Sequence, residues 1–106
     1  MDDILFLISE NLQQDDLGEW VPATVTRRVF CRVSSIDDNE FYDAGRSGLN
    51  PEARVTVFHA DYKGETVCRF KSNDYSIYRT KRIPNSDYID LYLERKGGSN
   101  GQTSND

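Results

Sequence analysis

The sequence contains one histidine and two cysteines among its 106 residues, so it has few side chains that hold metals or act as nucleophiles. Cys31, Cys68 and His59 stand far apart and lack the close ligand spacing of a zinc site. His59 and Asp61 would share one face of a strand, but two ligands are too few for most protein-bound metals. We interpret His59 as a strand-end residue at a wet edge. No Ser–His–Asp or Cys–His set can be assembled, so we expect no catalytic residue, metal or cofactor.

A long apolar run is also missing. The longest one, Ile4-Leu5-Phe6-Leu7-Ile8, is far shorter than the roughly 20 residues that span a bilayer. It follows two aspartates instead of the basic region of a signal peptide. We therefore expect no membrane association, a protein made and used in a cytoplasm, and two buried free thiols instead of a disulfide.

An excess of basic residues is the third absence. Thirteen Lys and Arg stand against eighteen Asp and Glu, which leaves a formal net charge of −5. A general nucleic-acid binder would show the opposite balance, because it must neutralise phosphates. The acidity is explained well enough by solubility.

Short β-type segments dominate what is present. They alternate apolar and polar residues and are separated by turn signals, which is typical of a β-sandwich or barrel. We predict a mainly all-β fold, a small antiparallel β-barrel of about six strands forming a single domain over residues 1–96. The expected strands cover residues 1–9, 24–34, 54–60, 66–70, 75–82 and 88–95.

Three details complete this prediction. Residues 1–9 carry the five-residue apolar run, which favours a strand buried on both faces. Residues 10–20 are polar, and we expect a loop there, with Pro22 at the entrance of the next strand. Residues 97–106 contain no apolar side chain, which predicts a disordered tail.

The connection at residues 36–52 is too long for a hairpin turn. Compact domains rarely keep such a connection unless it has a task. We expect a short helix over residues 40–44, capped by Ser34, Ser35 or Asp38 and stopped by Gly45. A flexible segment should follow it. This long loop is the main functional clue in the sequence.

The loop is rich in acids, among them Asp37, Asp38, Glu40 and Asp43. They lack the ordered ligand spacing of a calcium loop, so we prefer a solvated face.

Tyrosines and arginines alternate on residues 75–82. Small barrels bind single-stranded nucleic acid through such side chains, and Tyr75, Tyr78, Arg79 and Arg82 are the candidates here. Tyr and Arg are equally enriched in protein–protein interfaces, which the acidic total favours. The predicted interface residues are Arg28, Arg32, Tyr62, Tyr75, Tyr78, Arg79, Arg82 and Tyr92.

Six motifs in order resemble the head-closure, or head–tail joining, proteins of long-tailed bacteriophages. They are VFCRVSS at 29–35, EFYDAG at 40–45, GLNPE at 48–52, DYKGE at 61–65, YSIYRT at 75–80 and DLYLE at 90–94. The resemblance covers roughly residues 4–97.

The resemblance implies a ring, commonly dodecameric, that lies below the portal and its adaptor ring in the virion. Such a ring closes the DNA channel after packaging and presents a surface to the tail, so its partners would be its own copies, the adaptor, and a tail-terminator or tail-to-head joining protein. Packaged DNA would be near it in the channel. Assembly would take place in the host cytoplasm, and the resemblance implies no cofactor.

By the same resemblance, the long loop would be a stopper that projects into the channel, with Gly45 and Gly48 as its hinges. The stopper residues would be Asp37, Asp38, Glu40, Phe41, Tyr42, Asp43, Gly45, Arg46, Gly48 and Leu49. Acids multiplied around a ring would form a collar that repels DNA, unless they only cap and solvate the helix. Both interpretations stay open, as do a single-strand-binding barrel, a neighbouring neck or tail-terminator protein, and an enzyme that uses His59.

Overall fold

The computed structural model describes residues 2–96 and shows a closed six-stranded antiparallel β-barrel with one short helix between the second and third strands. The predicted fold class is therefore confirmed. The predicted tail, residues 97–106, lies outside the described residues. Along the chain come β1 (Asp3–Gln14), β2 (Trp20–Ser34), α1 (Asp38–Arg46), β3 (Pro51–Phe58), a 3₁₀ turn (His59–Asp61), β4 (Val67–Phe70), β5 (Asn73–Arg82) and β6 (Tyr88–Arg95).

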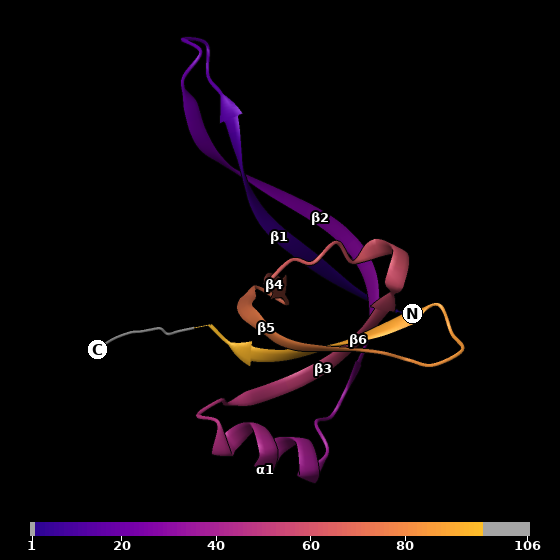
Figure 1. Cartoon of the computed structure of the whole chain (residues 1–106). Helices are drawn as coiled ribbons and strands as arrows, with labels where there is room; N and C mark the ends of the chain where they lie inside the picture. Colours follow the sequence, from indigo (N-terminus) through magenta and orange to yellow (C-terminus); the bar gives the residue numbers. More distant parts are fainter. Residues whose placement is uncertain (1, 97–106) are drawn as a thin grey trace.

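The barrel closes in the order β1-β2-β3-β6-β5-β4, and β4 returns to pair with β1 (Figure 1). Alternating strand positions point inward, as the period-two pattern requires. Ile89, Leu91 and Leu93 of β6 are buried, as predicted, and face Leu5 and Leu7 of β1 across a common core. Complete burial of a leucine side chain contributes about 2 kcal/mol, so this small core stabilises the fold mainly through a few well-packed residues.

The first strand corrects the expectation of burial on both faces. Leu5 and Leu7 are fully buried, whereas Ile4, Phe6 and Ile8 on the other face are only half-buried. The reason is that the barrel is a single layer closed on itself, so each strand has one core face and one outer face.

The predicted loop at residues 10–20 is wrong. The strands β1 and β2 stay paired out to Gln14 and Trp20, and only a short turn joins them. The Asp15 carboxylate accepts hydrogen bonds from the backbone N–H groups of Leu17 and Glu19, both at 2.9 Å, and Gly18 takes the positive φ of +80° that the turn requires.

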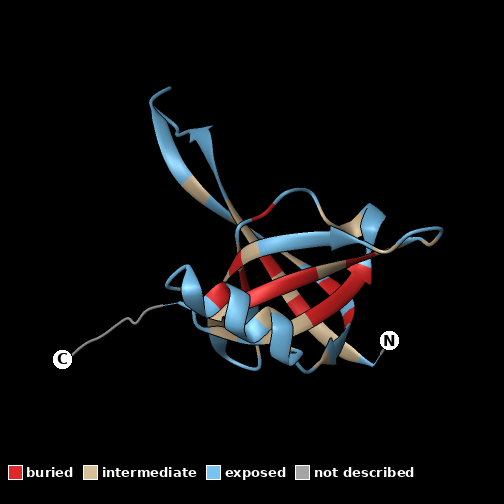
Figure 2. Cartoon of the chain, turned by 60° about the horizontal axis from the view of Figure 1, so that its bottom comes forward, coloured by how far each residue is buried: buried red, intermediate tan, exposed pale blue. Residues whose placement is uncertain are grey.

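The β1–β2 hairpin is much longer than the barrel needs. Pairing of β1 with β4 ends at Ile8, and pairing of β2 with β3 covers only Arg32 to Ser34. Beyond these points each strand pairs only with the other, and the far part of the hairpin projects away from the barrel (Figure 1). Figure 2 shows that the buried residues gather in the barrel strands, while most of the projection is exposed. We call residues 9–25 the arm.

A partly buried ion pair marks the place where the arm leaves the barrel. Arg27 lies on the core face of β2, and its guanidinium donates to the Glu65 carboxylate at 2.5 and 3.1 Å and to the Asp61 carbonyl at 2.7 Å. The Lys63 N–H also donates to Glu65, at 2.8 Å. Burial alone would raise the pKa of Glu65, but these hydrogen bonds and the charge of Arg27 hold the pKa below its ordinary value.

Candidate functional site

The long connection between β2 and β3 is the candidate site, and its helix is longer than predicted. The helix runs from Asp38 to Arg46 and therefore includes Gly45, and its C-cap is Ser47. The N-cap is Asp37 and not Ser34, Ser35 or Asp38, which were the residues expected. Its carboxylate accepts a hydrogen bond from the Glu40 N–H at 2.8 Å. A cap at this position satisfies one of the orphan N–H groups of the first turn.

The two glycines that were predicted to be hinges, Gly45 and Gly48, have different roles at the C-terminal end of α1. Gly48 has a φ of +82°, and the Leu49 N–H reaches back to the Ala44 carbonyl at 3.0 Å, which closes the helix. Gly45 lies within the helix and is not among the positive-φ glycines. Only Gly48 therefore occupies a backbone conformation that calls for glycine.

Two barrel side chains fasten α1 to β5. The Tyr78 hydroxyl donates to the Glu40 carboxylate at 2.9 Å, and the Arg79 guanidinium donates to its other oxygen at 2.5 Å. We call these three residues the latch. They line a depression of about 340 Å³ together with Ala44 and Leu49. Residues assigned from the sequence to two separate sites thus form one structural unit.

A shift in strand register makes the latch possible. The pairing of β5 with β6 slips between Ile77 and Arg79, so that Tyr78 is the extra residue. A bulge of this kind re-aims side chains, and here two consecutive residues both reach the same carboxylate. Burial, with the hydrogen bond and charge of Glu40, raises the pKa of Tyr78, which keeps its hydroxyl protonated and donating.

Most acids of the loop have local partners. Asp37 caps the helix, Glu40 belongs to the latch, and Asp43 forms an ion pair with Arg46 one turn later. Asp38 lies in the first turn and is exposed. These contacts favour the structural interpretation of the acidic cluster over a free collar of charge, because paired carboxylates project a weaker field.

The exposed apolar part of the helix is a pair of aromatic rings. Phe41 is 53% exposed and Tyr42 is 68% exposed, with their ring centroids 6.0 Å apart in an edge-to-face arrangement. Ala44 is buried against the barrel. The exposed surface of α1 therefore includes two aromatic rings, which are available to contact another molecule.

The predicted interface tyrosines are mostly inside the chain. Tyr75 and Tyr92 are buried, and the hydroxyl of the half-buried Tyr62 donates to the Glu65 carbonyl at 2.7 Å. The expectation of exposed tyrosines on these strands is thereby corrected. Tyr75 points into the core, while Tyr92 lies under Arg79, whose guanidinium is 4.2 Å from the ring centroid. A buried Tyr75 ring has no free face on which a nucleic-acid base could stack.

The predicted interface arginines, unlike the tyrosines, are exposed. Arg28 and Arg32 are exposed on the outer face of β2, with Phe30 between them at 55% exposure. Arg82 is exposed at the end of β5 and donates to the Ser86 carbonyl at 3.2 Å.

The arm carries three strongly exposed apolar residues that were not predicted from the sequence, Leu12, Leu17 and Trp20. Apolar side chains inside a polar stretch were the only signal that could have shown them.

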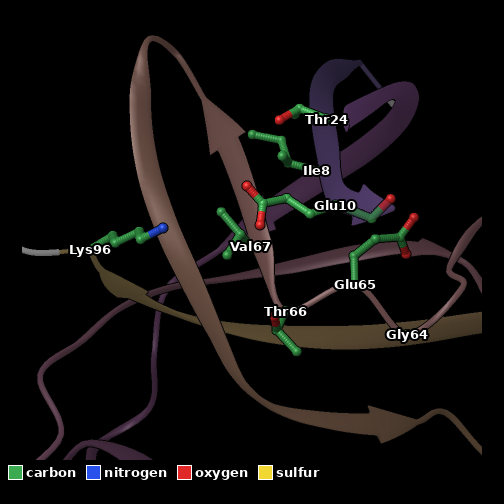
Figure 3. A pocket seen from close by; sticks show the side chains of 9 residues that line it. Ile8, Glu10, Thr24, Gly64, Glu65, Thr66, Val67 and Lys96 are labelled. Carbon is green, nitrogen blue, oxygen red and sulfur yellow. The ribbon is translucent and has the colours of Figure 1, made fainter. Parts of the chain in front are cut away.

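A groove lies at the base of the arm. It has a volume of about 410 Å³ and is lined from one side by Ile8, Glu10 and Thr24 of the hairpin. Residues 64–67 and Lys96 line the other side, and the Glu10 and Lys96 side chains extend toward one another in it (Figure 3). It opens where β4 stops pairing with β1, so part of the β1 edge is accessible there.

The surroundings of His59 were considered from the sequence as a metal or acid–base site. This residue is exposed at the start of the 3₁₀ turn, and within residues 2–96 no three His, Cys, Asp or Glu side chains are placed to hold a metal ion. Cys31 and Cys68 are buried free thiols, as expected. The helix α1, with nine residues, is much shorter than a membrane-spanning helix, and no other described helix is long and apolar enough.

No protein-family model matches the chain, and no curated protein matches it.

Proposed function

We propose that this protein is a structural ring subunit in the head–tail connector of a long-tailed bacteriophage. In this role several copies surround the DNA channel below the portal and its adaptor ring. They close the channel after packaging and present a surface for a tail-terminator or tail-to-head joining protein. The protein would lie in the neck of the virion, and packaged DNA would be close to it in the channel without sequence-specific binding.

The observation that carries the proposal is the helical excursion of residues 35–50, which interrupts the barrel between β2 and β3. The barrel itself needs no such connection between two neighbouring antiparallel strands, which a short hairpin would join. The excursion is ordered by its own cap and by the latch, and it presents Phe41 and Tyr42 outward. An ordered, protruding element with exposed aromatic rings suits a plug that blocks a channel sterically.

The resemblance of the six motifs to head-closure proteins supports the same role. Three of those motifs coincide with structural features described above. EFYDAG contains Glu40 of the latch, YSIYRT contains Tyr78 and Arg79, and DYKGE contains Glu65, the partner of Arg27. The motifs thus contain contacts that hold the loop and the barrel end in place.

The test is complementation of a phage that lacks this protein. Lysates without it should accumulate filled heads that lose their DNA and do not join tails, and the wild-type chain supplied in trans should restore infectious particles. As a control, a chain in which the exposed His59 is replaced by alanine should restore them equally well. If tails join and DNA stays in the heads when the protein is absent, the connector role is wrong.

A further inference from the structure

We propose that the arm of one copy docks on the outer face of β2 of a second copy, at Arg28, Phe30 and Arg32. We call these three residues the arginine face. The inference rests on the proposed ring and names the contact that builds it.

The arm is incomplete as it stands. Beyond Ile8 its two strands pair only with each other, and both outer edges carry unpaired backbone groups. An isolated two-stranded hairpin is at best marginally stable in water, and open strand edges are templates for other chains. A projection of this length therefore needs a partner surface to be useful.

Apolar side chains gather on the far part of the arm. Leu12 pairs directly with Pro22, and Trp20 pairs with Gln14, so that these residues share the face of the ribbon that lies outside the core. Leu12 and Trp20 are each 64% exposed, and Leu17 in the turn is 83% exposed. Exposed apolar clusters with polar surroundings mark interaction sites, and tryptophan is the residue most enriched among energetic hot spots.

The charge of the arm identifies the partner. Residues 9–25 contain four acids, namely Glu10, Asp15, Asp16 and Glu19, and no lysine or arginine. All basic residues of the chain lie in the remainder, between Arg27 and Lys96. An acidic, apolar tip is complementary to a surface that is basic and apolar, and complementarity of this kind selects partners.

The arginine face has that character. Arg28, Phe30 and Arg32 alternate on the outer side of β2 and are all exposed. None of the ion pairs found within residues 2–96 involves Arg28 or Arg32. A tryptophan ring placed between two guanidinium groups would gain cation–π contact in addition to buried area.

The contact must join two copies. Trp20 and Phe30 lie on one straight strand, and ten residues at about 3.3 Å each separate them by about 33 Å. The tip of the arm therefore cannot fold back onto its own arginine face. A contact between two different patches is heterologous, and repetition of such a contact closes into a ring when the rotation permits.

The test uses two variants that each remove one half of the contact. Leu12→Ser with Trp20→Ser removes the apolar arm surface, and Arg28→Glu with Arg32→Glu reverses the charge of the receiving face. Sedimentation of the wild-type chain at up to about 1 mM should show association beyond the monomer. Each variant alone should weaken that association at least about tenfold. A mixture of the two should form a one-to-one dimer that does not grow further.

The matched control is Tyr42→Ser, which removes an aromatic ring of similar exposure from α1 and should leave the association unchanged. A wild-type chain that stays monomeric, a mixture that stays monomeric, or equal weakening by the control would each overturn the proposal. Unchanged thermal unfolding of the barrel in the arm variant excludes misfolding, because Leu12 and Trp20 lie outside the core.

The readouts separate this inference from the proposed function. If the mixed dimer forms but a phage without the protein retains its DNA, the docking is right and the connector role is wrong. If DNA retention depends on the protein while the arm variant associates and functions normally, the connector role is right and the arm contact is wrong.

Discussion

The Tyr78 hydroxyl donates a hydrogen bond of 2.9 Å to the Glu40 carboxylate and so joins the barrel to the helix that interrupts it. The residues are 38 positions apart in sequence, and Arg79 reaches the same carboxylate. Because the helix makes few other contacts with the barrel, this latch decides how firmly α1 is held. Its strength is open to direct measurement.

Replacement of Tyr78 by phenylalanine should loosen α1 without unfolding the barrel. The ring stays in place, while a hydrogen bond to a charged group worth about 1–2 kcal/mol is lost. We expect the backbone amides of Asp38–Arg46 to exchange with solvent about tenfold faster, since about 1.4 kcal/mol corresponds to a factor of ten. Tyr42→Phe, also on α1 but exposed, should leave the exchange rates unchanged. Equal rates in wild type and Tyr78→Phe would show that the latch does not hold the helix.

Removal of the N-cap should weaken the same helix from its other end. Asp37→Ala loses the hydrogen bond to the Glu40 N–H and should destabilise α1 by about 1 kcal/mol. Asp37→Asn should cost much less, because an amide oxygen caps nearly as well. Circular dichroism and amide exchange report the change. If Asp38→Ala has the same effect as Asp37→Ala, general loss of negative charge near the helix start is responsible.

The partly buried pair of Arg27 and Glu65 should contribute more to stability than any exposed charge. Arg27→Ala leaves a buried carboxylate without its main partner, and we expect a loss of about 2–4 kcal/mol in the free energy of unfolding at pH 7. The neighbouring Arg28, exposed on the opposite face, is the matched control, and its replacement should stay within about 0.5 kcal/mol. Urea denaturation measures both, and similar losses would contradict the assignment.

The pH dependence of this pair has a definite sign. The pKa of Glu65 is lowered in the fold, so the pair stabilises the protein above the unfolded-state pKa, 4.5, and this contribution is lost as the pH falls through the folded value. In Arg27→Ala the hydrogen bonds and charge of Arg27 are gone, and only the backbone hydrogen bonds still oppose burial, so the pKa of Glu65 is higher than in the wild type. The difference in stability between wild type and Arg27→Ala should therefore shrink as the pH is lowered from 7 toward 4.

The two thiols should be inert in the native protein. Burial raises the pKa of Cys31 to about 11 and the pKa of Cys68 to about 12, so neither forms a thiolate near neutral pH. A thiol reagent should modify both only after urea unfolding. The unfolded thiols ionise from their ordinary pKa of 9.0 upward while the native ones stay protonated, so stability should fall as the pH rises from 9 to 11. Rapid labelling of the native chain would contradict this account.

The barrel could be predicted from the sequence because its signals are local. The last strand, Tyr88–Arg95, matches its predicted bounds, since Ile89, Leu91 and Leu93 alternate without interruption between turn residues. The arm could not be predicted in this way. Its residues face water on both sides, so no apolar alternation marks it, and its strands are held by the pairing itself and by the Asp15 turn.

The candidate site shows the same division. A helix in the long loop could be predicted, although its N-cap is Asp37 and it continues past Gly45. The latch depends on a register shift at Tyr78 that no local pattern reveals. The burial of Tyr92 also depends on a distant neighbour, because Arg79 covers its ring. The sequence therefore pointed to Glu40, Tyr78 and Arg79 but gave no sign that these three residues contact one another.

The most direct test of the channel-closing role is to replace residues 37–50 by a short Gly/Ser linker and measure nuclease-protected DNA in heads. The chain is supplied to a phage that lacks it, and a variant with His59→Ala, an exposed residue outside the loop, serves as the control. Our account predicts that rings form and heads fill, but that the linker variant leaks DNA while the wild type and the control retain it. Full DNA retention and normal infectivity with the linker would contradict the claim that this loop closes the channel.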